Sequence, residues 1–226
     1  MKLLGIETAT LVCGTAIVED GVVLAEEFIE RKNAHAENIM ARVNGVFRSS
    51  GVRLSELDAI AVSIGPGSFT GLRIGLSVAK GLCYSADKPL VAVSTLYALA
   101  RRALQSGKVA TRYLLPAIDA RRDEVYAQLF RVNDNLLESG WAQQDVSIAE
   151  LAYRLNGLPV SVTGDARGKI VANERMRMLN VVPDEFALCR GGIIAIVGEE
   201  MARRGEIVDP MPAEPLYLKA FYSLVP

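Results

Sequence analysis

A buried strand that passes through a glycine-rich loop into a helix constrains the fold of this chain more than any other feature. The apolar run 57–64 is typical of a strand covered on both faces, and 72–85 has the composition of a helix. The loop between them reads Gly65-Pro66-Gly67-Ser68-Phe69-Thr70-Gly71. Because a strand followed directly by a helix is the building unit of α/β proteins, we expect an α/β fold.

The loop has two readings. Glycines permit tight turns, and the free N–H groups at the start of a helix can hold an anion. The loop is not a P-loop, because no Gly-Lys-Ser/Thr follows, and it lacks the Gly-x-Ser-x-Gly of a nucleophile elbow. The residues of this structural or anion-holding loop are Gly65, Gly67, Ser68, Thr70 and Gly71.

One order of elements occurs twice, imperfectly, along the chain. Hydrophobic periodicity predicts strands at 3–6, 13–18, 22–29, 57–64, 90–93, 113–118, 125–132, 136–142 and 159–163. It predicts helices at 34–50, 72–85, 96–105, 148–155 and 193–204. We therefore expect two related α/β halves. They are domain 1–106 and domain 107–226, whose mostly irregular tail (210–226) is free to pack back on the first; without this tail the second domain is the smaller one.

The predicted helix 72–85 is apolar around most of its circumference. Such a helix is either buried within the monomer or packed on its own core and on a partner. Each interior glycine costs about 1 kcal/mol relative to alanine, which makes sense where another helix approaches closely. One apolar face consists of Leu72, Leu76, Ala79 and Cys83, and the other of Ile74, Val78 and Leu82, with Gly71, Gly75 and Gly81 nearby. The polar stripe is Arg73, Ser77, Lys80 and Tyr84.

Charge and composition exclude several classes of protein. The chain has 25 Lys and Arg against 26 Asp and Glu, so it lacks the basic excess of a protein that binds nucleic acid alone. Its three cysteines are widely spaced, which favours buried thiols in a cytoplasmic protein over a disulfide framework or zinc cluster. Neither a signal peptide nor a membrane-spanning run of about 18 apolar residues is found in the sequence.

Few residues offer catalytic chemistry. His35 is the only histidine, so a multi-histidine metal site cannot form, and its polar neighbours place it on the surface. Glu7 follows the first strand and could hold a metal-bound water, but no second acidic residue occurs in 8–14. The run Arg121-Arg122-Asp123-Glu124 reads as solvated charges. We therefore predict no catalytic residue and no metal site.

Several segments together resemble one family, from the first strand to the tail. The segments are 4–10, 64–76, 91–96, 116–126 and 215–218. They are similar to the bacterial TsaB (YeaZ) proteins, and Gly-Pro-Gly-Ser-Phe-Thr-Gly is quite specific to TsaB and its larger paralogue TsaD. The resemblance implies two halves of the actin-like and sugar-kinase-like (ASKHA) fold, each a mixed sheet flanked by helices.

The resemblance also implies a function. TsaB pairs with TsaD and the ATPase TsaE to transfer threonylcarbamoyl to adenosine 37 of tRNAs that read ANN codons. In TsaD the metal ligands follow the pattern His-x-x-x-His, which would fall just after strand 91–93. This chain has no histidine there. The resemblance therefore implies a non-catalytic, cytoplasmic scaffold that activates TsaD and has no cofactor of its own, with ATP or ADP at the interface of the complex.

The family's partner surface implies which residues meet TsaD. Two helices from each protein form a four-helix bundle, and the same surface forms a homodimer when TsaD is absent; tRNA binds only within the complex. The two faces of the second helix are interchangeable at this stage. The expected interface residues are Met40, Val43 and Phe47 from the first helix and Leu72, Leu76, Ala79 and Cys83 from the second.

Rival functions require features that the sequence lacks or shows only in part. A glycoprotease-type peptidase needs a metal or nucleophile site. A nucleotide-binding ATPase of the same fold needs two phosphate loops, of which Glu7 and Gly164-Asp165 are incomplete versions. Direct contact with tRNA inside the complex is a third option. The residues available for it are Arg121 and Arg122, or Arg167 and Lys169.

Overall fold

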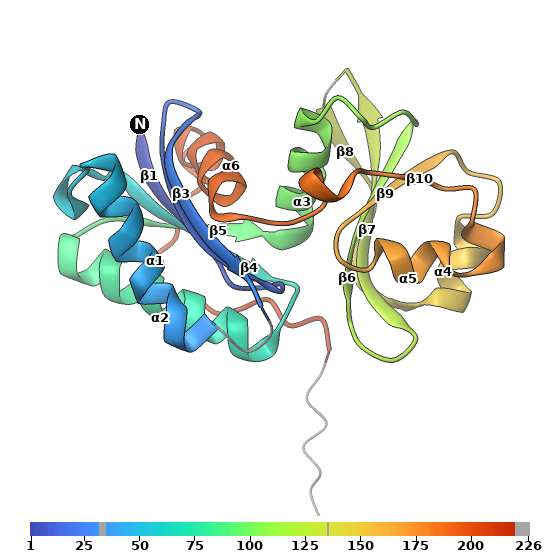
Figure 1. Ribbon diagram of the computed structural model, residues 1–226, viewed down its shortest axis with the longest axis horizontal. Coiled ribbons are helices and arrows are strands. Elements are labelled where there is room, and N and C mark those ends of the chain that lie inside the picture. The colour runs from blue at the N-terminus through green and yellow to red at the C-terminus, as the bar shows by residue number, and fades with distance from the viewer. Residues whose placement is uncertain (32–34, 135, 220–226) are drawn as a thin grey trace, which may run out of the picture.

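The chain folds into two lobes, each built around a five-stranded sheet (Figure 1). The computed structural model describes residues 1–31, 35–134 and 136–219. Residue 34 of the predicted first helix and residues 220–226 of the predicted tail lie outside the described residues. None of the helices in the described part of the chain is long and apolar enough to cross a membrane.

The first lobe has the strand order β3-β2-β1-β4-β5. Its hairpins β1–β2 and β2–β3 are antiparallel, whereas β4 and β5 continue the sheet in parallel from β1. The strands are β1 (Lys2–Glu7), β2 (Val12–Glu19), β3 (Val22–Glu30), β4 (Ala59–Gly65) and β5 (Leu90–Ser94). The helices of this half are α1 (His35–Ser50), α2 (Phe69–Ala86) and α3 (Thr95–Gln105), with a 3₁₀ turn at Leu54–Glu56.

The second lobe repeats this topology with the order β8-β7-β6-β9-β10. Here β6–β7 and β7–β8 are antiparallel, and β9 and β10 follow β6 in parallel. The strands are β6 (Tyr113–Asp119), β7 (Glu124–Asn133), β8 (Leu136–Ser147), β9 (Val160–Thr163) and β10 (Asn180–Val181). The helices in the second half of the chain are α4 (Ile148–Arg154), α5 (Arg167–Val171) and α6 (Gly191–Arg203), with 3₁₀ turns at Glu174–Met176 and Asp184–Phe186.

The shared topology confirms the prediction of two related α/β halves. Sequence periodicity missed only short elements, namely α5, β10 and the 3₁₀ turns, which are too short to show a period. Strand β8 extends to Ser147. The prediction ended it at residue 142 because the last residues of the strand are mostly polar.

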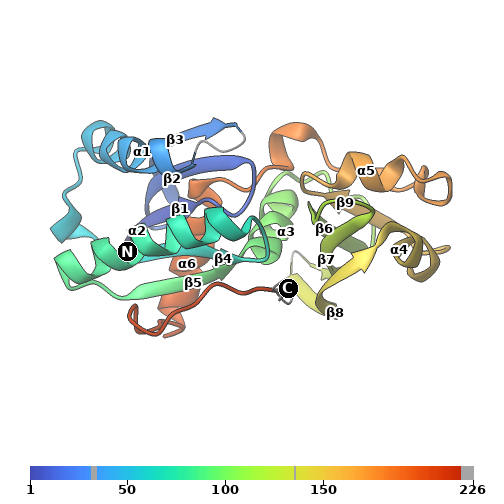
Figure 2. The ribbon, with the colours of Figure 1, turned by 90° about the horizontal axis from the view of Figure 1, so that it is seen from below.

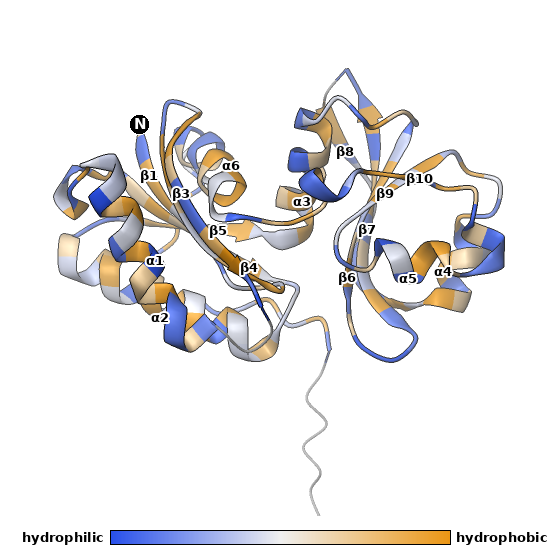
Figure 3. Ribbon diagram, in the orientation of Figure 1, coloured by the Kyte–Doolittle hydropathy of each residue, from blue (hydrophilic) through white to orange (hydrophobic). Residues whose placement is uncertain are grey.

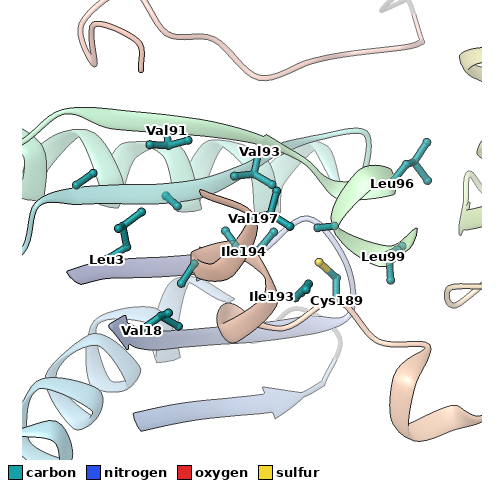
Figure 4. Packing of buried hydrophobic residues seen from close by; sticks show 14 of the residues in the cluster. Leu3, Val18, Val91, Val93, Leu96, Leu99, Cys189, Ile193, Ile194 and Val197 are labelled. Atoms are coloured by element: carbon teal, nitrogen blue, oxygen red, sulfur yellow. The ribbon is translucent and has the colours of Figure 1, made fainter. Parts of the chain in front are cut away.

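Helix α6 packs on the first lobe, although the predicted division assigned it to the domain 107–226. Its side chains Ile193, Ile194 and Val197 form a common core with Leu3 of β1 and Leu96 of α3 (Figure 4). Small residues permit this approach, since a Cβ on Gly5 would lie 2.2 Å from the carbonyl oxygen of Gly191. Helix α3 in turn contacts β6 and packs Ala103 and Leu104 into the second lobe. The last helix of each half therefore lies between the two sheets (Figure 1).

The tail after α6 returns along the first lobe to the region between the lobes (Figure 2). Val208 N–H donates to the carbonyl of Leu90, and Leu216 N–H donates to that of Ile64 (2.7 Å). At its described end, Lys219 Nζ binds Glu124 Oε2 in the second lobe (2.6 Å). The described part of the tail thus connects the two lobes.

Candidate interaction surface

The glycine-rich loop is seated against the loop that follows β1. Ser68 N–H donates to the carbonyl of Ala9 (2.7 Å), and Ser68 Oγ caps α2 by accepting from Gly71 N–H (3.2 Å). A Cβ on Gly67 would lie 2.2 Å from Ala9 O. Gly65 has φ 121° and faces the carbonyl of Leu216, whereas Thr70 is exposed. These contacts give the loop a structural role, because two of its N–H groups already have partners inside the chain.

One apolar face of α2 belongs to the core of the first lobe. Leu72, Leu76, Ala79 and Cys83 are at most 4% exposed, and so is Val43 of α1. Val43, Leu76, Ala79 and Cys83 share a core with residues of β1, β2 and β4. These five side chains are therefore buried within the monomer in this structure, and that they meet a partner stays a prediction.

The opposite side of α2 faces outward and continues onto α1. Ser77 and Gly81 are exposed, and Ile74, Val78 and Leu82 are half-buried at the edge of the core. On α1, Met40 is 46% exposed and Phe47 is half-buried. We call this set the outer face, which consists of Met40, Phe47, Ile74, Ser77, Val78, Gly81 and Leu82. Figure 3 shows α2 mostly white and orange.

Nothing in the described part of the monomer requires a glycine at position 81. A Cβ at this position would meet nothing within 4 Å, and its φ is not positive. An exposed glycine in the middle of a helix costs about 1 kcal/mol relative to alanine. The outer face therefore contains a residue that weakens the helix without any compensating contact in the described chain.

The tail bounds the outer face at the start of α2. Tyr217 packs on Phe69 with ring centroids 5.1 Å apart, and its hydroxyl accepts from Arg73 Nε (3.0 Å). Arg73 also lies over the Phe69 ring at 3.7 Å. Lys80 Nζ donates to the carbonyl of Met211. Sequence reasoning did not assign these residues, since nothing local links positions this far apart.

Glu7 is fully buried at the end of β1. Its Oε1 accepts from the N–H (2.9 Å) and the hydroxyl of Thr10, and Oε2 has no hydrogen-bond partner among the described residues. Burial raises the pKa of Glu7 to about 7, which the neighbouring Ser63, Cys189 and Thr10 oppose only in part. A carboxyl enclosed in this way keeps its proton more readily than an exposed one.

His35 is buried, which contradicts the expected surface position. The first turn of α1 packs against the loop between β1 and β2, so His35 is only 7% exposed. Its Nε2 lies 3.0 Å from the carbonyl oxygen of Thr10 and 3.3 Å from that of Val12. Because a carbonyl oxygen only accepts, Nε2 carries the proton. This nitrogen is therefore not available to a metal or nucleophile.

A small cavity lies between the lobes. It has a volume of about 10 Å³ and is lined by Thr10, Leu11, Leu99, Asp165 and the segment 187–189. This is room for about one water molecule, far below the roughly 300 Å³ of a small-molecule site. Burial raises the pKa of Asp165. Across the described ranges, no three His, Cys, Asp or Glu side chains gather as a metal site would require.

The predicted charged run forms the exposed turn between β6 and β7. Arg121, Arg122 and Asp123 are exposed, as expected of solvated charges. Arg167 and Lys169, by contrast, are used inside the lobe. Arg167 binds Asp184 and the carbonyl of Gly164, and Lys169 binds Asp119 and the carbonyl of Glu124.

Comparison with known proteins gives a consistent picture. The family model described as "TsaD: tRNA N6-adenosine threonylcarbamoyltransferase" matches residues 22–177. The chain is 34% identical over 225 residues to the tRNA threonylcarbamoyladenosine biosynthesis protein TsaB of Escherichia coli, which covers 97% of this chain and 95% of that relative. It is also similar in structure to YeaZ from Pseudomonas aeruginosa, with a TM-score of 0.82 and 28% identity over 96% of this chain and 99% of that one.

A more distant likeness concerns the fold alone. The ROK hexokinase from Thermus thermophilus has a TM-score of 0.50 and 12% identity, over 88% of this chain and 99% of the hexokinase. Together with the repeated topology of the two sheets, this confirms the expected actin-like and sugar-kinase-like fold class.

Proposed function

The chain belongs to the TsaB (YeaZ) family and has a role in tRNA threonylcarbamoyladenosine biosynthesis, and from that premise we propose that it is a non-catalytic scaffold that binds and activates TsaD. The complex, with TsaE, transfers threonylcarbamoyl to adenosine 37 of tRNAs reading ANN codons, in the cytoplasm. In the absence of TsaD, the chain forms a homodimer through the same surface.

The observation that carries this proposal is the outer face of α1 and α2. Its apolar side chains are partly exposed, and Gly81 leaves space in which a second helix can approach closely. We therefore expect the partner to meet Met40 and Phe47 together with Ile74, Val78 and Leu82, because the other apolar face of α2 is buried within the monomer.

The interior of the chain supports a scaffold rather than an enzyme or an ATPase of the same fold. The single histidine is bound to backbone carbonyls, and no three metal-ligating side chains gather among the described residues. We expect ATP or ADP, where the complex uses one, at the interface with the partner. The proposal therefore assigns no catalytic residue and no resident cofactor to this chain.

Size-exclusion chromatography with light scattering tests the proposal, using the chain alone and mixed with TsaD of the same organism. Met40→Glu and Ser77→Glu, alone and combined, place a charge on the outer face at exposed positions, so the monomer should stay folded. Met178→Glu is the matched control, because Met178 is 96% exposed in the second lobe. We expect the wild type and the control to form the mixed complex, and the double variant to lose it and the homodimer.

Two other results would be informative. If wild type and TsaD do not associate at all, the scaffold function is wrong. If they associate and the double variant associates equally well, the scaffold function stands, and the assignment of the outer face is wrong.

A further inference from the structure

Two arginines occupy a backbone conformation that arginine rarely adopts. Arg121 and Arg122 lie between β6 and β7 with φ 69° and 48°, and both are exposed. A positive φ is unfavourable for a residue with a Cβ, whereas glycine adopts it freely and asparagine tolerates it. Folding alone would therefore favour other residues at these two positions.

The turn is held firmly in place. Arg121 N–H donates to Asp119 Oδ1 (2.9 Å), and Glu124 N–H donates to the carbonyl of Arg121 (3.2 Å). From the tail, Lys219 Nζ donates to the carbonyl of Ala120 (3.0 Å). The backbone that presents the two guanidinium groups is thus fixed on both sides of the turn.

Lysines neutralise the carboxylates at the base of the turn. Lys169 binds Asp119 (2.8 Å), and Lys219 binds Glu124 (2.6 Å) and lies 3.5 Å from Asp145. This leaves Asp123 as the exposed carboxylate without such a lysine. Among the described residues no hydrogen bond or ion pair joins either guanidinium group, although the charge of Arg122 acts on Glu124 and that of Arg121 acts on Tyr126. Their charge is available to a partner, whereas that of Arg167 and Lys169 is not.

We propose that Arg121 and Arg122 contact the phosphate backbone of the tRNA when it is bound to the complex. This inference rests on the proposed function. Guanidinium groups suit phosphates, which they bind with two parallel hydrogen bonds. With a net charge of −1 the chain has no broad basic excess, so the contact is local and independent of base sequence.

The test separates RNA binding from folding. Arg121→Asn with Arg122→Gly replaces both arginines by residues that tolerate a positive φ, so the melting temperature should stay equal or rise. Arg175→Gln with Arg177→Gln is the matched control, since both arginines are exposed in the same lobe and the charge change is identical. The affinity of the complex with TsaD for an unmodified transcript of a tRNA reading ANN codons is measured between about 50 and 200 mM salt.

We expect the Asn-Gly variant to bind TsaD normally but to bind the transcript roughly tenfold more weakly, with a salt slope smaller by about 1 to 2. The control should bind both as the wild type does. Unchanged affinity and slope in an intact complex would overturn the RNA contact and leave the scaffold function standing. An equal loss in the control would also overturn it, because the effect would then be one of net charge. Failure of the wild type to bind TsaD would overturn the proposed function and this inference with it.

Discussion

The two sides of α2 use glycine for different reasons. On the inner side, a Cβ on Gly71 would lie 2.0 Å from the carbonyl oxygen of Thr8, and one on Gly75 would lie 2.1 Å from Thr8 Oγ1. On the outer side, a Cβ on Gly81 would meet nothing. The inner glycines are explained by the close approach of β1 to the helix, whereas the outer one is not explained within the monomer. An apolar, glycine-rich helix can therefore serve a core and a partner at once.

The largest expected contrast between the two sides is in the stability effect of a new charge at two adjacent positions of α2. Leu76→Glu should lower the free energy of unfolding by roughly 3–5 kcal/mol, because it leaves an unpaired charge in the core. Ser77→Glu, one residue later on the exposed side, should change it by less than about 0.5 kcal/mol. Urea denaturation of the two variants measures the contrast. Equal effects would mean that the two sides of α2 have been assigned wrongly.

A second contrast between the two sides concerns pH. The buried carboxyl of Glu7 lies at the end of β1, in the sheet that the inner side of α2 covers. Its folded pKa of about 7 exceeds the ordinary 4.5, so between these values the folded state keeps a proton that the unfolded state loses. The free energy of unfolding therefore falls as pH rises through this window, by about 3 kcal/mol in total.

Glu7→Gln should remove this loss of stability. Compared with the wild type, the variant should show a change between pH 4.5 and 8 that is smaller by about 3 kcal/mol, as measured by urea denaturation. Ser77→Glu is a useful control here, because a carboxyl on the outer side should add no such dependence. An unchanged pH profile in Glu7→Gln would show that this carboxyl is ionised in the folded state at neutral pH.

The third contrast is between the glycines themselves. Gly75→Ala should destabilise the monomer by roughly 1–3 kcal/mol, since the new methyl group collides with the buried Thr8. Gly81→Ala should stabilise it by about 0.5–1 kcal/mol and weaken association with TsaD. Thermal melting and the dissociation constant of the complex check the two signs. A destabilised Gly81→Ala monomer would remove the reason for assigning this glycine to a partner.

The smallest effect is expected for Tyr217, where the tail lies beside the start of α2. Tyr217→Ala removes the ring contact with Phe69 and the hydrogen bond from Arg73, and should cost about 1 kcal/mol or less. The amide of Leu216, which is bonded to the carbonyl of Ile64, should then exchange its hydrogen faster. Tyr217→Phe is the conservative control that keeps the ring. Unchanged exchange in Tyr217→Ala would show that the tail does not depend on this contact.

The class of fold, the order of the long elements and the family could all be predicted from the sequence. These rest on local signals, namely the period of apolar residues and the loop 65–71. The predicted helix 34–50 corresponds to α1 (His35–Ser50), and 96–105 to α3 (Thr95–Gln105). The spacing of apolar residues within one helix also indicated that α2 has two apolar faces.

Which of those faces lies inside becomes clear only from the packing of the whole chain, because both faces are apolar and nothing local distinguishes them. The same holds for His35, which is polar in sequence context but lies under the loop between β1 and β2. It holds for α6, whose Gly192 N–H donates to Glu26, 166 residues away in the chain. These contacts join segments that are remote in sequence, so no periodicity within one segment can encode them, and they depend on how the helices pack on the sheet.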